Sequence, residues 1–201
     1  MAIENIKTSP WAGFERVIFA GVKTDTKETY EFDKIIDIVD GAVSMSFNIS
    51  ATDVSHYSSN KKTAADKTFS PSGSVTWAGD DYRIDELLLG SIHKDGGLYD
   101  NLGAPNEIAV IAGYNRADGG WMVRFLTKAT ASKDDMTFAT KGESVTFTNP
   151  SATLNCMAST YFNTYKIDFD SNDPAHTGKT LNDIIDALLA DPMTKFEEVG
   201  V

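Results

Sequence analysis

Much of the chain alternates between apolar and polar residues, the pattern of strands with one buried face. The clearest case is 43–49, Val-Ser-Met-Ser-Phe-Asn-Ile, where every second residue is apolar. The same alternation recurs at 145–147 and 165–169, and turn residues flank both segments. We predict six further strands, at 16–22, 28–32, 68–77, 107–114, 121–127 and 152–158. About nine short strands predict a mainly β fold, a β-sandwich or split barrel.

Strands 107–114 and 121–127 are predicted to form an antiparallel hairpin. The six residues from Asn115 to Gly120 join them. The paired glycines at the end of this loop supply the positive φ that a hairpin turn needs.

Near its end the chain changes to helical periodicity. Apolar residues recur there at the three-and-four spacing of a buried helical stripe: Leu181, Ile184, Ile185, Leu188 and Leu189. We predict a C-terminal helix over 180–191, with these five residues packing on the sheet. Thr180 is its expected N-cap, Asp183 favours the positive end of the helix dipole, and Pro192 stops the helix.

A shorter mid-chain helix is predicted for 82–92. Ile84, Leu87 and Leu88 would cover one end of the sheet, and glycines at 90, 96 and 97 limit the helix length.

The segment 50–67 fits neither periodicity. It is rich in Ser, Thr, Ala, Asn and Lys and has no periodic apolar face. Connections in compact domains usually have about 4 to 6 residues. We therefore predict a long loop that either has a function of its own or is disordered.

Chain length and net charge limit the classes of function that we expect. With 201 residues we expect a single domain over 1–201. The 18 Lys and Arg against 29 Asp and Glu give a net charge of -11, with only four Arg, so we expect neither tight binding to nucleic acid nor attraction to an anionic membrane. The single cysteine precludes an intrachain disulfide, and no signal peptide or membrane-spanning segment is expected. These features fit a reducing cytoplasm.

The residues that could carry chemistry are few. His56, His93 and His176 share no motif and are predicted to lie on the surface or in loops. Cys156 alternates with Leu154 and Ala158 and has no basic neighbour, so it is predicted to be a small core residue rather than a nucleophile. We expect no enzyme activity and no cofactor.

An acidic run at 168–173 imitates the first half of a calcium-binding loop. Asp168, Asp170 and Asn172 stand at the first, third and fifth positions, but Asp173 replaces the sixth-position Gly and Lys179 replaces the twelfth-position Glu. We therefore expect a solvated turn and no metal site.

The aromatic residues leave an alternative open. Exposed rings on a β-sandwich can grip sugars, and the chain has Trp11, Trp77 and Trp121. Core or interface positions are the simpler interpretation, since two of them lie at strand ends. A soluble carbohydrate-binding or other ligand-binding module is nevertheless the alternative function, with an enzyme as the third.

Two stretches resemble a known family. One runs from Thr127-Lys128-Ala129-Thr130-Ala131-Ser132-Lys133-Asp134-Asp135 through 139–147 into Thr153-Leu154, and the other covers 68–90, including Gly73-Ser74-Val75-Thr76-Trp77 and Leu88-Leu89-Gly90. In the amino-acid sequence of these stretches and in the order of its strands, roughly from residue 15 to 170, the chain resembles the major tail tube proteins of long-tailed, non-contractile bacteriophages.

The resemblance implies a virion protein made in the host cytoplasm. Its copies would form rings, usually hexamers, that stack into the tail tube. The partners would be further copies and the tape-measure, tail-terminator and distal-tail proteins, and DNA would pass without specific binding. The loop 50–67 would reach a neighbouring subunit, with these contact residues: Asp53, His56, Tyr57, Asn60, Lys61 and Lys62.

Two physical arguments agree with that implication. Six copies would carry a net charge of -66 (6 × -11), and an anionic wall would not retain DNA. A ring can also pair sheet edges that a monomeric β protein must protect.

Overall fold

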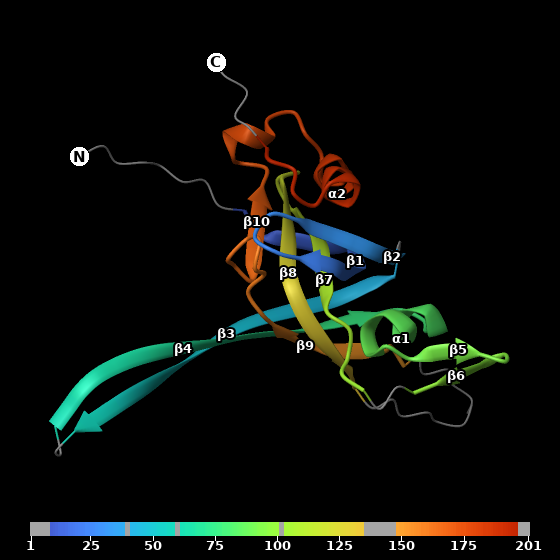
Figure 1. Ribbon diagram of the computed structural model, residues 1–201. Coiled ribbons are helices and arrows are strands. Elements are labelled where there is room, and N and C mark those ends of the chain that lie inside the picture. The colour runs from blue at the N-terminus through green and yellow to red at the C-terminus, as the bar shows by residue number, and fades with distance from the viewer. Residues whose placement is uncertain (1–8, 39–40, 59–60, 101–102, 135–147, 197–201) are drawn as a thin grey trace, which may run out of the picture.

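The computed structural model describes residues 9–38, 41–58, 61–100, 103–134 and 148–196, with the backbone alone for 51–58 and 61–68. The strands in these residues are β1 (Trp11–Asp25), β2 (Tyr30–Ile38), β3 (Ala42–Ser58), β4 (Lys61–Trp77), β5 (Ile92–Lys94), β6 (Gly97–Tyr99), β7 (Ile108–Arg116), β8 (Trp121–Lys133), β9 (Ser151–Cys156) and β10 (Lys166–Asp170). The helices are α1 (Tyr82–Leu89), α2 (Leu181–Ala190) and the 3-10 helix η1 (Pro174–His176). The expected mainly β fold with one mid-chain and one C-terminal helix is confirmed (Figure 1). The strand expected at 145–147 lies outside the described residues.

Eight of the strands form one antiparallel sheet, in the order β2-β1-β7-β8-β9-β4-β3 with β10 paired to β8 beside this path. The expected hairpin of 107–114 and 121–127 is present as β7 and β8. β8 pairs with β10 along 122–126 and with β9 along 129–133. The first half of β8 therefore has β10 beside it and the second half has β9. In Figure 1, β3 and β4 lie below β1 and β2.

The central strands are buried on both faces. In β1 the consecutive residues Val17, Ile18, Phe19 and Ala20 have no exposed surface, and alternate side chains enter two different clusters. Val17 and Phe19 share the first cluster with Trp77 of β4, although β1 and β4 are not neighbours in the sheet. The sheet therefore folds back on itself around this cluster.

Helix α1 closes one end of that cluster. Asp81 caps its start by accepting a 2.9 Å hydrogen bond from the backbone N–H of Arg83, and Ile84, Leu87 and Leu88 are buried. The predicted extent to residue 92 is too long, because the left-handed Gly90 (φ 71°) ends the helix. Ile92 instead begins the small β5–β6 hairpin.

Helix α2 covers the second cluster, on the other face of β7 and β8. The Thr180 hydroxyl accepts from the backbone N–H of Asp183 at 3.2 Å, and the Asp183 carboxylate accepts from the N–H of Thr180 at 2.7 Å. This capping box fixes the first turn. The stripe lies against the sheet, with Leu181, Ile184, Ile185 and Leu188 buried and Leu189 half-buried.

Residues 50–58 and 61–67 are strands rather than a loop, which corrects the prediction for this segment. β3 and β4 continue through it as one antiparallel hairpin, paired from Ala42 with Trp77 to Ser58 with Lys61. The outer part stands away from the body of the molecule (Figure 1). Two strands that project from the body need no alternating apolar residues to face a core, so the sequence lacked the signal that predicts strands elsewhere.

Candidate functional site

The β3–β4 hairpin beyond residue 50, which we call the arm, holds the residues predicted to contact a neighbouring subunit. Asp53, His56 and Tyr57 lie on β3, opposite Lys67, Ala64 and Lys62 respectively. Lys61, the first residue of β4, lies opposite Ser58, and Asn60 is outside the described residues. Pairing of the two strands therefore gathers the predicted contact residues on one projecting arm.

An exposed apolar face marks the base of the arm. Ile49 pairs with Pro71, and Phe69 pairs with Ala51, so their side chains point to the same side of the hairpin. Ile49 is 41% and Phe69 58% exposed. Large apolar side chains gathered on an open strand face are typical of an interaction surface.

The next residue on this face attaches the hairpin to the body. Phe47 stacks on Tyr165 with 6.1 Å between ring centroids, and the Arg124 guanidinium lies 5.4 Å from the Phe47 ring centroid. A Cβ at Gly73, the partner of Phe47, would lie 2.7 Å from the backbone oxygen of Ser46. The ring of Phe47 thus holds the hairpin against the body, and within the hairpin the close approach of β3 to β4 at this position requires glycine.

The edges of the sheet differ in charge. β2 and β3 end the order of strands and β10 pairs only with β8, so each has an edge without a strand partner among the described residues. β2 and β10 each carry at least three charged residues, which discourage association along an edge. β3 carries no charged residue from Ala42 to Ser50. Among these three edges, that of β3 therefore has the longest stretch without charge.

A second exposed apolar surface lies on the β5–β6 hairpin. Ile92 pairs with Tyr99 and His93 with Leu98, and the apolar members are exposed by 58%, 55% and 36%. The ring of Tyr82 in α1 lies tilted against that of His93, with 4.7 Å between the ring centroids. This hairpin was not predicted, although the dipeptide Asp95-Gly96 in its turn was a readable signal: both residues have positive φ, 53° and 76°.

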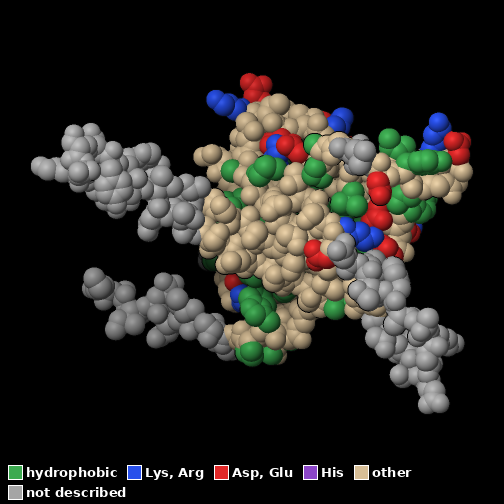
Figure 2. All heavy atoms as spheres, turned by 90° about the horizontal axis from the view of Figure 1, so that it is seen from below, with side chains coloured by type: hydrophobic (Ala, Val, Ile, Leu, Met, Phe, Trp, Pro, Cys, Tyr) green, Lys and Arg blue, Asp and Glu red, His purple; other side chains and the backbone are tan. Residues whose placement is uncertain are grey.

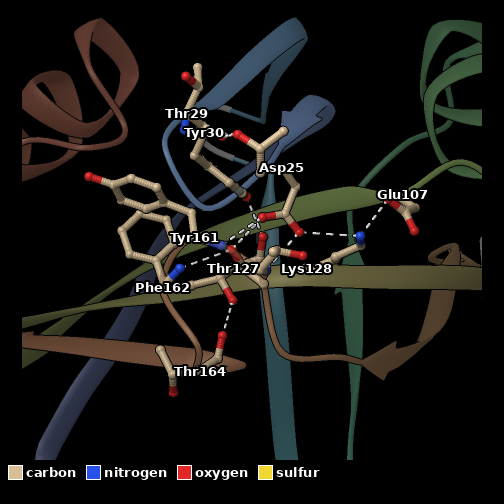
Figure 3. A network of polar contacts seen from close by, with 12 residues as sticks. Asp25, Thr29, Tyr30, Glu107, Thr127, Lys128, Tyr161, Phe162 and Thr164 are labelled. Atoms are coloured by element: carbon tan, nitrogen blue, oxygen red, sulfur yellow. Dashed lines mark hydrogen bonds and ion pairs between the residues drawn. The ribbon is translucent and has the colours of Figure 1, made fainter.

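Figure 3 shows a polar network at the end of β1 that joins four distant segments. The Asp25 carboxylate accepts from the Ser159 hydroxyl at 2.8 Å, from the backbone N–H groups of Thr160 and Tyr161 at 3.0 Å, and from Lys128 at 3.3 Å. Lys128 also forms an ion pair with Glu107 at 2.7 Å. Both carboxylate oxygens of Asp25 therefore accept hydrogen bonds. These bonds hold the connection between β9 and β10 against β1 and β8.

The pKa of Asp25 follows from these contacts. Burial, with 4% of the side chain exposed, would raise the pKa. The hydrogen bonds from Thr160, Tyr161, Ser159 and Lys128 outweigh burial and hold the pKa below its ordinary value. A carboxylate held in its ionised form by four donors is suited to holding the structure together rather than to accepting a proton.

The candidate chemical groups have ordinary structural surroundings. Cys156 is buried, as predicted, and burial raises the pKa of its thiol to about 11. His93 is exposed. His176 lies in the connection between β10 and α2, as the prediction of a surface or loop position allowed, but it is only 5% exposed and packs on the rings of Trp121 and Phe169. Its Nδ1 lies 2.9 Å from the backbone oxygen of Asp170. The side chain of His56 lies outside the description.

The acidic run at 168–173 is dispersed among partners. Asp168 pairs with Arg124 at 2.8 Å and Asp170 pairs with Arg116. Asp173 accepts from the backbone N–H of Ala175 at 2.9 Å and begins η1. Within the described ranges, no group of three or more His, Cys, Asp or Glu side chains is placed to hold a metal ion.

The tryptophans do not form a platform for a sugar. Trp77 has no exposed surface, and Trp121 is buried with its indole N–H donating to the Lys179 carbonyl at 3.0 Å. Trp11 is 53% exposed and lies against Tyr114 and the guanidinium of Arg116. Of the three tryptophans, Trp11 alone is exposed.

Neither α-helix of the described chain has the length and apolar character that crossing a bilayer requires. No protein-family model matches the chain, and no curated protein matches it in sequence. The exposed strand edge, the arm and the two apolar surfaces are accordingly the features from which a function is argued.

Proposed function

We propose that the chain is a structural subunit that assembles with copies of itself into stacked, hexameric rings of a phage tail tube. The observation that carries the proposal is β3, a 17-residue strand whose open edge has no charged residue from Ala42 to Ser50 and which continues into the projecting arm. Monomeric β proteins protect such edges with charges, bulges or covering segments. An edge left open along this length is suited to pairing with a strand of another copy.

The electrostatics agree with a conduit. A chain of net charge -11 gives a ring of six -66 (6 × -11), and duplex DNA carries about one negative charge per 1.7 Å of its axis. DNA and such a wall repel each other, so DNA passes without being held. Copies of the chain, the tape-measure protein and the terminator and distal proteins of the tail are the partners in this proposal.

Negative-stain microscopy and sedimentation of the concentrated full chain test the proposal. Wild-type protein should form rings or rods whose amount rises with concentration. The double variant Ser44→Lys/Asn48→Lys adds two charges along the exposed part of β3 and should stay monomeric with an unchanged melting temperature.

Asn172→Lys is the matched control, since it adds a lysine at an exposed turn away from β3. It should assemble as the wild type does. A wild-type chain that stays monomeric at every concentration and salt would reject the proposal, and so would rods that form equally well from the β3 variant.

A further inference from the structure

The β5–β6 hairpin is exposed on both of its faces. All six of its strand residues except Gly97 are exposed, and within the described part of the chain its one aromatic contact with the body is that of His93 with Tyr82. A two-stranded hairpin in water is at best marginally stable by itself. A surface that displays Ile92, Leu98 and Tyr99 in this way is typical of a site covered by a partner.

A cavity lies beside the hairpin, and one residue of its wall has a buried hydroxyl without a partner among the described residues. It has a volume of about 400 Å³ and is lined in part by Leu89, Ser91, Pro105 and Ala131. Ser91, which directly precedes β5, is 6% exposed, and its hydroxyl has no hydrogen-bond partner among the described residues. A buried hydroxyl without a partner is uncommon and destabilising, so an incoming group that pairs with it would be favoured.

Charge distinguishes this end of the molecule from the arm. The segment 79–100 has six carboxylates against Arg83 and Lys94, and they remain in excess when Lys34 and Lys133, which pair with Glu86 and Asp85, are added. The arm segment 50–67 has three lysines against two aspartates, a net charge of +1 in a chain of -11. Opposite charges of this kind steer association more than they add affinity.

The two surfaces lie at opposite ends of the molecule. The arm extends from one side of the body and β5–β6 from the other (Figure 1), and hydrophobic side chains with acidic ones beside them gather at the β5–β6 end in Figure 2. Different surfaces at opposite ends form a head-to-tail contact between copies, the kind that closes into a ring or continues as a filament. From residue 49 to residue 58 a strand spans roughly 30 Å, which is enough to reach across an adjoining subunit.

We infer that the β5–β6 hairpin, with α1 and the cavity of Ser91 beside it, receives the β3–β4 arm of a second copy of the chain. The inference rests on the proposed function and names the surface that the arm contacts. The apolar residues Ile92 and Tyr99 provide the contact area, and the acidic surroundings orient the basic arm.

Disulfide cross-linking between full-length chains tests the contact directly. In a Cys156→Ala background, Lys62→Cys places a thiol on the arm and Tyr99→Cys one on the hairpin. A mixture of these two chains should form the mixed disulfide at least about tenfold faster than Lys62→Cys mixed with Met157→Cys, which is exposed on the loop after β9. An equal rate would overturn the inference, as would faster linkage of Tyr99→Cys chains to one another, which indicates a hairpin-to-hairpin contact.

Assembly of the double variant Ile92→Ser/Tyr99→Ser separates this inference from the proposed function. It should need a concentration about tenfold higher than the wild type to form rods, while Met157→Ser behaves as the wild type. Wild-type rods with an unaffected double variant would reject the hairpin as the receiving surface and leave the proposed function standing. A wild-type chain that never assembles would reject both.

Discussion

Asp25 shows how a single residue holds distant parts of this chain together. Its carboxylate connects the end of β1 with Ser159, Thr160 and Tyr161, which lie 134 to 136 residues further along. Tyr30 adds to the same site by donating its phenolic hydrogen to the backbone oxygen of Thr127. Burial raises the pKa of Tyr30 well above its usual range, so it remains a donor at all ordinary pH values.

We predict that Asp25→Asn lowers the free energy of unfolding at pH 7 by about 2 kcal/mol, because hydrogen bonds to a charged acceptor become bonds to a neutral one. The pKa of Asp25 is lower in the folded chain than its ordinary 3.8, so the folded state favours the ionised form. This stabilisation is complete above the ordinary pKa and disappears as the pH falls through the folded-state value.

Urea unfolding at pH 7 and near pH 3 measures this effect. The difference between wild type and Asp25→Asn should shrink at the lower pH, whereas the exposed control Asp95→Asn should match the wild type at both. A difference that stays constant with pH would show that the charge of Asp25 contributes nothing.

Local chemistry could be predicted at the residue scale and distant partners could not. Thr180 and Asp183 are three residues apart, so their capping box is visible in the sequence. The burial of Cys156 follows from the alternation around it. The partners of Asp25 and the burial of His176 depend on how remote segments meet, and no spacing in the chain encodes this.

At the scale of elements, α2 gives the most direct stability prediction. Leu188 is 1% exposed and belongs to the second cluster. Leu188→Asp places an unpaired carboxylate there and should lower the free energy of unfolding by about 3 to 5 kcal/mol, measured by urea or thermal unfolding. Asp186→Ala on the exposed face should change it by no more than about 0.5 kcal/mol. An unchanged melting temperature for Leu188→Asp would mean that α2 does not pack on the sheet in solution.

Most strands and helices that face a core were predicted, but the strand predicted at 28–32 ended too early, because β2 continues to Ile38 and its Ile36 and Ile38 pack in the first cluster. The arm and the β5–β6 hairpin were not predicted as strands. The β7–β8 hairpin and α2 bury one or both faces, and this burial is visible in the spacing of their apolar residues. The arm has no core beneath it and reads as a polar loop. β5 and β6 have three residues each, too few for any period to be recognised.

The register of the arm suggests a clean way to remove it. Thr52 pairs with Thr68, so deletion of 53–65 leaves Asp66 and Lys67 as a two-residue turn between paired strands. Asn-Gly at those two positions gives the turn type that two-residue hairpins prefer. We predict that this variant keeps the wild-type melting temperature within about 3 °C, since the arm adds nothing to the core, and that it forms no rods in sedimentation.

A variant with the same deletion but the original Asp66 and Lys67 is the control for turn chemistry. It should also fold, with a somewhat lower melting temperature. Unfolding of both variants would show that the arm belongs to the folding unit, and rods from either would show that assembly does not need it.

At the scale of the whole molecule, two properties act together. The sheet leaves the edge of β3 open, without a charged residue from Ala42 to Ser50, while the chain as a whole carries a net charge of -11. Net repulsion keeps isolated copies apart until local contacts outweigh it, and screening over about 8 Å at physiological salt confines that repulsion to short range. Assembly therefore depends on specific surfaces rather than on overall attraction between subunits.

The same charge determines how an assembled tube treats DNA. We predict that wild-type rods do not retain a fluorescent DNA duplex in co-sedimentation at about 50 mM salt, where contacts with phosphates are strongest. The duplex alone and rods alone, sedimented in parallel, are the controls. Retained DNA that is released as salt increases would reveal a basic wall inside an acidic molecule. Such a wall would bind phosphates and slow passage, which is the opposite of what a conduit requires.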